Sequence, residues 1–283
     1  MEQTFDPGPS PPASTEYRQR PTDAAPEWAA AFPAFAAVGL MLLWAAHDGG
    51  YDADTWYWGA LAILGLLVVL IAGLGTRVFG VSRITKLAFA SFAGYVGWSY
   101  LSIAWAGSPG DALQGSNRAL LFLLVFALFV ATPWTPRLAF WLLMTYTVGV
   151  GAIAVVILLR IAGGHSSTLF SDGRLVAPTG YFNASAALFT AAALAAVALA
   201  ARREAPTILR GALLAGCCAE LQLALLAQSR GWLFTLPLVA LASLVLVHNR
   251  ARVAVAALLP IAGMLALLSP LLAVFRARGG GSA

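Results

Sequence analysis

Charged side chains are scarce in this sequence. They make up only 10% of its 283 residues, whereas soluble globular domains average about 25%. The 12 acidic and 17 basic side chains are too few to cover the surface of a water-soluble protein of this length, and the mean hydropathy of +0.81 agrees. The composition therefore excludes a soluble domain and predicts a protein whose solvent is lipid.

Cysteine and histidine are also scarce. Cys217 and Cys218 are adjacent within an apolar run, where neighbours cannot easily bridge, so no disulfide framework is expected. The histidines, at positions 47, 165 and 248, lack the spacing of metal ligands, and no nucleotide-binding or nucleophile motif is present. We therefore expect no metal and no cofactor. The arginines are scattered between apolar runs, which is typical of membrane-protein loops and not of nucleic-acid binding.

Residues 1–27 lack any apolar run. They contain six of the 15 prolines, together with Ser, Thr, Glu and Asp. Such a segment cannot offset the entropy cost of folding, so we predict a disordered cytoplasmic tail. The first apolar run follows without a small-residue cleavage site, which indicates an uncleaved span and not a signal peptide.

Long apolar runs dominate the rest of the chain. A helix needs about 20 apolar residues to cross the hydrocarbon layer, and runs such as LAILGLLVVLIAG are apolar on every side, which favours helices over barrel strands. The sequence therefore predicts an all-α, polytopic transmembrane helical bundle over 28–275 and a flexible outer end at 276–283. The nine predicted spans are 28–46, 56–75, 87–106, 118–133, 138–160, 183–201, 211–228, 231–247 and 253–275.

The distribution of arginine and lysine sets the predicted orientation. With the N-terminal tail inside, eleven basic residues fall in cytoplasmic segments and six in outer segments. Nine spans then place the C-terminus outside. We expect a multi-pass protein of a bacterial cytoplasmic (inner) membrane.

Three of the outer arginines accompany predicted helix starts. The fourth, sixth and eighth spans run from outside to inside, so their N-termini, with free N–H groups and positive dipole ends, face outward. Arg118, Arg174 and Arg230 lie close in sequence to these starts. A helix N-terminus combined with a guanidinium is an anion site. The alternative interpretation is that each arginine anchors the protein to lipid headgroups.

Each of these helix starts also has a candidate capping residue. Ser116 and Asn117 precede Arg118, Asn183 opens the sixth span, and Ser229 opens the eighth. Asn183-Ala-Ser also matches a glycosylation acceptor, although a cap is the favoured role. The turn Ser229-Arg230-Gly231 joins two spans through about three residues, and Gly231 leaves the backbone open to a phosphate. These residues predict binding of a diphosphate at the outer headgroup level.

Glu220 is the one acidic residue deep within a predicted span. It precedes Arg230 by ten residues, which places it roughly 15 Å below that arginine in the membrane. An intramembrane carboxyl group is a functional candidate by default. The alternative is a packing residue that is protonated or hydrogen-bonded, with Gln222 nearby in sequence.

Three segments between residues 95 and 247 together resemble the bacterial O-antigen ligase and polymerase superfamily of polytopic membrane glycosyltransferases. The first, SIAWAGSPGDALQGSNRALLFLLVFALF, is similar to an early family segment in which an arginine opens a long apolar helix. The second, TGYFNASAALFTAAALAAVALA, resembles the asparagine entry to a later helix, and LLAQSRGWLFTLPLVAL resembles the family's Ser-Arg-Gly turn. The matching residues are Trp105, Pro109, Arg118, Gly180, Phe182, Asn183, Ser229, Arg230 and Gly231.

The resemblance implies a reaction at the outer leaflet. An acceptor hydroxyl attacks the anomeric carbon of a glycan carried on a polyprenyl diphosphate, and the diphosphate leaves. In the family, outer arginines hold that group without a metal or a nucleotide, which here implies Arg118 and Arg230, with Asn183 nearby. The expected partners are the glycan donor, a glycan, lipid or protein acceptor, and membrane lipids. Ligation and polymerisation remain open because both use the same donor.

The chain also departs from the family pattern. Its Asn183-Ala-Ser segment lacks the second asparagine that members often carry. Members continue beyond a span like 253–275 into a large outer loop with a catalytic histidine, so we expect a chain of 283 residues to be inactive alone. Two alternatives therefore stay open: a transporter or flippase of lipid-linked saccharides, and a non-catalytic membrane partner.

Overall fold

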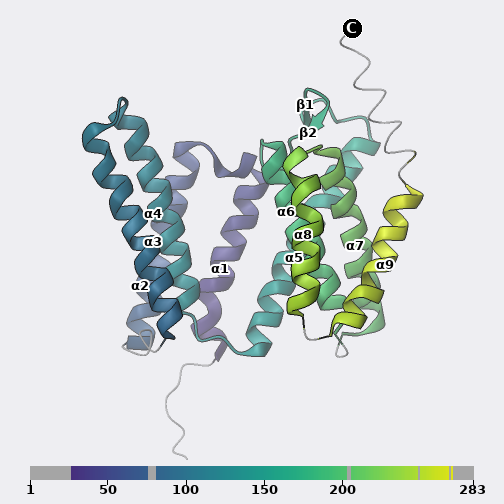
Figure 1. The fold of residues 1–283 in the computed structure, drawn as a ribbon, viewed down its shortest axis with the longest axis horizontal. Coiled ribbons are helices and arrows are strands. Elements are labelled where there is room, and N and C mark those ends of the chain that lie inside the picture. Colours follow the sequence, from purple (N-terminus) through teal and green to yellow (C-terminus); the bar gives the residue numbers. More distant parts are fainter. Residues whose placement is uncertain (1–26, 76–80, 203–204, 248, 268, 270–283) are drawn as a thin grey trace, which may run out of the picture.

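The fold consists of long helices and one small hairpin (Figure 1). The computed structural model describes residues 27–75, 81–202, 205–247, 249–267 and 269. The predictions for the N-terminal tail up to residue 26 and for 276–283 lie outside these residues. The α-helices of the described part are α1 (Glu27–Ala46), α2 (Ala53–Leu74), α3 (Arg83–Leu101), α4 (Pro109–Ala131), α5 (Pro136–Ala162), α6 (Phe182–Ala200), α7 (Thr207–Leu226), α8 (Arg230–Leu246) and α9 (Arg250–Ala266), and short 3₁₀ helices lie at Asp48–Gly50 and Ser102–Trp105.

The helices α1 to α7 are each long and apolar enough to cross a membrane. The structure thus confirms an all-α, multi-pass membrane protein. Helices α8 and α9 have 17 residues each, fewer than the roughly 20 that a span normally needs. Of the nine spans expected, seven therefore meet the length and hydropathy of a membrane helix in the described residues, and the count of nine stays a prediction.

Helix starts follow local capping chemistry. Thr135 caps α5 by accepting a hydrogen bond from the Leu138 amide at 3.3 Å, and Pro136 occupies the first helical position, where a missing N–H costs nothing. Ser82 caps α3 in the same way, accepting from the Thr85 amide at 3.1 Å. Polar residues placed directly before apolar runs therefore fix where these helices begin.

The predicted start of the fourth span, near residue 118, is wrong. Helix α4 begins at Pro109, more than two turns earlier, and the hydroxyl of Ser108 donates to the Asp111 carboxylate at 2.7 Å beside that start. Hydropathy finds where an apolar run begins, whereas the helix here starts with polar turns that precede the run. Arg118 consequently lies inside α4 and not at its N-terminus.

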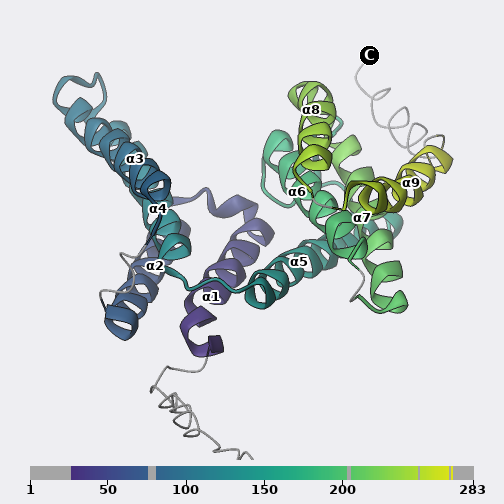
Figure 2. The same cartoon turned by 60° about the horizontal axis from the view of Figure 1, so that its bottom comes forward.

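The helices form two groups, α1–α4 and α5–α9, joined by packing of α1 against α5 (Figure 2). In the first group, Trp56, Ile63 and Leu128 belong to one buried apolar cluster contributed by α1, α2 and α4. In the second, Phe189 and Leu223 belong to a cluster that joins α5, α6 and α7. This second group carries most of the candidate site residues.

Successive helices run in opposite directions, so that α2, α4, α6 and α8 begin at the same end of the molecule (Figure 1). That end also carries the antiparallel strands β1 (Phe170–Ser171) and β2 (Arg174–Leu175), and we call it the hairpin end. The turn between the strands is Asp172-Gly173, with φ of 49° and 72°, which is the backbone of a tight hairpin turn.

Exposed aromatic side chains occur near both ends of the bundle. Such belts are typical of membrane proteins, because Trp and Tyr have an apolar body and a polar tip that suit the headgroup level. Trp28, Trp134 and Trp141 lie towards the end opposite the hairpin, and Tyr51, Trp58, Trp98, Trp105 and Tyr181 lie towards the hairpin end.

Candidate functional site

The start of α8 is built as the sequence predicts. Helix α7 ends at Leu226 and α8 begins at Arg230, so the turn between them has three residues. Ser229 is the N-cap, and its buried hydroxyl accepts a hydrogen bond from the Trp232 amide at 3.1 Å. The other amides of the first turn lack intrahelical acceptors, which makes this end positive.

Space beside this helix start is open. A Cβ atom added to Gly231 would meet no closer neighbour than Ser229 Oγ, at 4.0 Å. Arg230 is exposed. The backbone of the first turn is therefore accessible to an anion, and a guanidinium is covalently fixed at the same turn.

A groove of about 450 Å³ lies between α6 and α8 and includes this helix start. At its hairpin end it is lined by Asn183, Ser229 and Gly231, and further along by mainly apolar side chains. Within it, the indole N–H of Trp232 donates to the Thr190 hydroxyl and ties α8 to α6. The remaining lining residues are Ala187, Ala191, Leu194, Thr235, Leu236 and Val239.

Asn183 is in this groove but is not the cap of α6. The helix begins at Phe182 with Tyr181 in the N-cap position, and the Asn183 amide donates to the Tyr181 hydroxyl. A cap must precede the first helical residue, and Asn183 comes after it, so the predicted capping role is wrong. Asn183 instead lines the wall of the groove, with its side-chain amide bonded to Tyr181.

The side chain of Arg174, on strand β2 of the hairpin, lies against the start of α6. Its guanidinium carbon lies 4.9 Å from the ring centroid of Phe182, the residue before Asn183. The hairpin is itself tied to the α7–α8 turn, because the Gln228 side-chain amide donates to the Gly173 carbonyl at 3.0 Å. This contact of Gln228 was not predicted from the sequence. The Asp172-Gly173 pair was the available signal for a hairpin turn.

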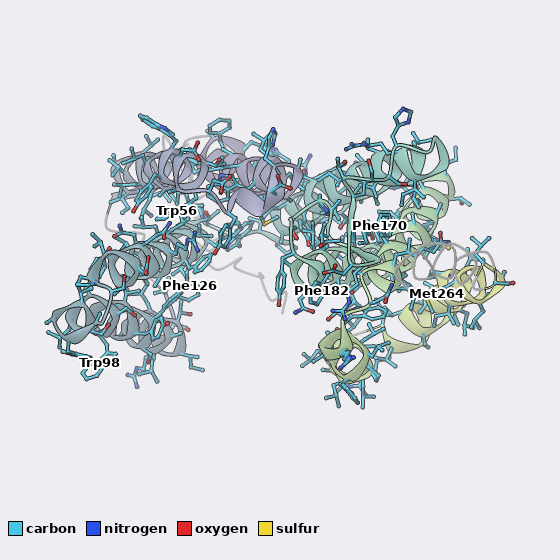
Figure 3. All side chains as sticks on the ribbon, turned by 90° about the horizontal axis from the view of Figure 1, so that it is seen from above. Trp56, Trp98, Phe126, Phe170, Phe182 and Met264 are labelled. Atoms are coloured by element: carbon cyan, nitrogen blue, oxygen red, sulfur yellow. The ribbon has the colours of Figure 1, made fainter. Side chains whose placement is uncertain are left out.

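Arg118 does not line the groove. Its guanidinium donates to the Tyr51 carbonyl at 2.8 Å and lies 4.5 Å from the Tyr51 ring and 5.6 Å from the Trp56 ring. Figure 3, viewed along the bundle, shows Trp56 in the first helix group and Phe182 in the second. The structure therefore brings Asn183, Ser229 and Gly231 together and leaves Arg118 with another set of contacts.

The caps predicted beside Arg118 are also wrong, since both residues lie inside α4. The Ser116 hydroxyl donates to the Ala112 carbonyl at 2.8 Å within the helix. The Asn117 side chain joins two tyrosines, accepting from Tyr100 at 2.6 Å and donating to Tyr57 at 3.0 Å. The bonds of Asn117 link α4 to α3 and α2, whereas the bond of Ser116 stays within α4.

Glu220 is fully buried on α7, and neither carboxyl oxygen has a hydrogen-bond partner among the described residues. A Cβ added to Gly151 of α5 would lie 3.6 Å from one of these oxygens. Glu220 has no hydrogen bond to Gln222, whose side-chain amide instead donates to Cys218 Sγ at 3.3 Å. Glu220 is thus an unsatisfied acid in the interior of a membrane helix.

Comparison of the chain with protein-family models, with curated proteins and with solved structures found no match. The resemblance to the O-antigen ligase superfamily therefore rests on the residues of the chain itself.

Proposed function

We propose that this chain is a membrane glycosyltransferase of the O-antigen ligase type, and that the groove between α6 and α8 holds its polyprenyl-diphosphate donor. The observation that carries the proposal is the groove itself. It joins a polar mouth formed by Asn183, Ser229 and Gly231 to a long apolar wall. A polyprenyl diphosphate is likewise polar at one end, its anionic diphosphate, and apolar along the other, its isoprenoid chain.

The polar mouth suits a diphosphate. The N-terminus of α8 offers free N–H groups and a positive dipole end, and Gly231 leaves room beside the backbone. Arg230 adds a guanidinium that can bind phosphate oxygens in bidentate fashion. Such fixed donors stabilise the negative charge that develops on a leaving diphosphate.

The apolar wall suits the isoprenoid chain. From Asn183 to Leu194 the groove follows α6 for about 16 Å, which is enough for the first isoprene units. Ala187 and Ala191 keep this part of the wall open, whereas Leu236 and Val239 supply apolar contacts from α8. Because the isoprenoid chain already lies in the hydrocarbon layer, these contacts replace contacts with lipid acyl chains and mainly position the donor.

We place the hairpin end on the outer side of a bacterial inner membrane, in agreement with the excess of basic residues expected inside. An acceptor hydroxyl then attacks the anomeric carbon of the donor glycan, and the diphosphate leaves with its lipid. Both ligation to a lipid or protein and polymerisation of glycan units use this step.

A transporter or flippase of lipid-linked saccharides is the second candidate function, and Glu220 is the observation that favours it. A carboxyl group that lies inside a membrane helix and has no partner among the described residues is typical of proton-coupled transport. Exchange of Glu220 for Gln would abolish proton-coupled transport, whereas donor binding at the α6–α8 groove would be unaffected.

The test of the proposed function compares two ligands, a polyprenyl diphosphate and the uncharged polyprenol, in nanodiscs. Arg230→Ala should weaken diphosphate binding roughly ten- to a hundredfold, because a charge-assisted hydrogen bond contributes about 1.5–3 kcal/mol. Polyprenol binding should change little. Arg230→Lys should recover part of the loss, since lysine keeps the charge without the bidentate geometry.

Arg137→Ala is the matched control, because Arg137 is an exposed boundary arginine at the opposite end of the bundle, beside Trp28. It should leave both affinities unchanged. If the ratio of the two affinities stays the same in Arg230→Ala, Arg230 is a headgroup anchor and the proposed donor site is wrong.

A further inference from the structure

A second groove, of about 390 Å³, is lined by the first turns of α7 and α9 and by the end of α6. It lies at the end of the bundle opposite the hairpin, where α7 and α9 both begin (Figure 1). The donor groove shares none of its lining residues. A ligand in this second groove therefore does not occupy the donor site.

Two guanidinium groups line this groove, one from each helix. Arg210 is the fourth residue of α7, Arg252 is the third residue of α9, and both side chains are half-buried. The described residues that line the groove include no aspartate or glutamate. Like charges that share a partly desolvated groove repel each other, and a bound anion offsets that repulsion.

The two helix starts add to this positive charge. Neither Pro206, the N-cap of α7, nor Asn249, the N-cap of α9, makes a side-chain capping hydrogen bond. The first amides of both helices lack intrahelical acceptors, so the positive ends of two helix dipoles lie at this end of the groove. The negative dipole end of α6 also reaches the groove at Ala200, but it carries about half a charge against two full guanidinium charges.

One turn further into the membrane the lining is apolar. Leu214 follows Arg210 by four residues and Val255 follows Arg252 by three, so each lies on the same helix face as its arginine. At 1.5 Å per residue, these side chains start about 4.5–6 Å deeper than the arginines. The groove is thus cationic at the membrane boundary and apolar below it, which matches the headgroup and acyl chain of a phospholipid.

We propose that this groove binds a phospholipid of net negative charge, with its phosphate held by Arg210 and Arg252 and an acyl chain against Leu214 and Val255. Basic pockets between membrane helices are sites of this kind. A zwitterionic phospholipid is disfavoured because its own cationic group lies beside the phosphate and meets the two guanidinium groups. The bound lipid ties the short helix α9 to α7, and its binding is independent of the proposed glycosyl transfer.

The test is native mass spectrometry of the full chain in detergent, titrated with phosphatidylglycerol or phosphatidylcholine that carry the same acyl chains. We expect the wild type to bind phosphatidylglycerol at least tenfold more tightly. Arg252→Gln should weaken phosphatidylglycerol binding about tenfold, through loss of charge-assisted hydrogen bonds, and leave phosphatidylcholine binding unchanged. Arg252→Lys should recover part of the loss, because it keeps the charge without the planar fork.

Arg250→Gln is the matched control, because Arg250 lies two residues from Arg252, is exposed and does not line the groove. It should leave the affinity for phosphatidylglycerol unchanged. Arg230→Ala should also leave it unchanged, so failure of this site and failure of the donor site can be told apart.

Equal affinity of the wild type for the two lipids would overturn the proposal. So would an equal loss in Arg250→Gln and Arg252→Gln, because the attraction would then come from the general surface charge. Excess inorganic phosphate should not release the lipid, since phosphate makes no contact with the apolar wall. Release by phosphate would assign the groove to a soluble anion and would also overturn the proposal.

Discussion

Arginines of the hairpin end differ in what their guanidinium groups contact. Arg118 is committed to Tyr51 and Trp56 through one hydrogen bond and two cation–π contacts. Arg174 stacks on Phe182, and Arg230 is exposed beside an open helix start. The sequence predicts all three as diphosphate ligands because it places them near helix starts, but side-chain partners depend on tertiary packing that spacing does not reveal.

Arg118→Ala should therefore lower stability without weakening the binding of a polyprenyl diphosphate. Loss of its cation–π contacts removes about 0.5–2 kcal/mol, which we expect to appear as a melting temperature lowered by a few degrees. Thermal unfolding in detergent and lipid binding in nanodiscs measure the two effects. A tenfold loss of diphosphate affinity would contradict this and would mean that Arg118 contributes to donor binding.

Helices are predicted from this sequence better than their ends. Every predicted span from 28–46 to 231–247 has a helix at its position, because an apolar run of this length must satisfy its backbone internally. The start of α4 and the role of Asn183 were wrong because polar turns can belong to a helix without contributing to an apolar run. The hairpin at Asp172-Gly173 was missed because two-residue strands have no periodicity to detect.

Substitutions of Ser229 can separate its role as the N-cap of α8 from the proposed binding of a diphosphate at the start of that helix. Ser229→Ala should lower the free energy of unfolding by about 1 kcal/mol through loss of the α8 cap. Ser229→Asp should keep the cap, but it places a negative charge at the groove mouth and should weaken diphosphate binding at least tenfold. Thermal unfolding and lipid binding distinguish these effects.

The matched control is Ser82→Asp, because Ser82 caps α3 in the same way at the opposite end of the bundle. It should leave lipid binding unchanged. Unaltered diphosphate affinity in Ser229→Asp would mean that no phosphate lies at the start of α8.

At the scale of the whole molecule, two helix groups meet through α1 and α5. This division could not be predicted from hydropathy, since lipid-facing and buried residues in these helices are equally apolar. The alternation of helix direction was predictable, because each span must return the chain to the other side. This alternation of helix direction places the mouth of the donor groove, Arg174 and Arg118 at one end of the bundle.

The direction of the whole bundle in the membrane is tested by thiol labelling of intact cells with an impermeant maleimide, after replacing Cys217 and Cys218 by serine. The excess of basic residues in 202–210 and in the other segments of that side predicts that this side is cytoplasmic. Gly107→Cys and Asp172→Cys should be labelled, whereas Pro206→Cys should react only after lysis. The reverse pattern would place the groove mouth inside and exclude an outer-leaflet donor.

The central claim is that the groove between α6 and α8 binds a polyprenyl diphosphate. Its most direct test is photo-crosslinking of the full chain in nanodiscs with a polyprenyl diphosphate that carries a diazirine on its first isoprene units, followed by peptide mapping. We predict labels on α6 between Ala187 and Leu194 and on α8 between Thr235 and Val239, with labelling competed by unmodified polyprenyl diphosphate and reduced in Arg230→Ala. Labels confined to other helices, or labels on α6 and α8 that unmodified diphosphate does not compete, would contradict the claim.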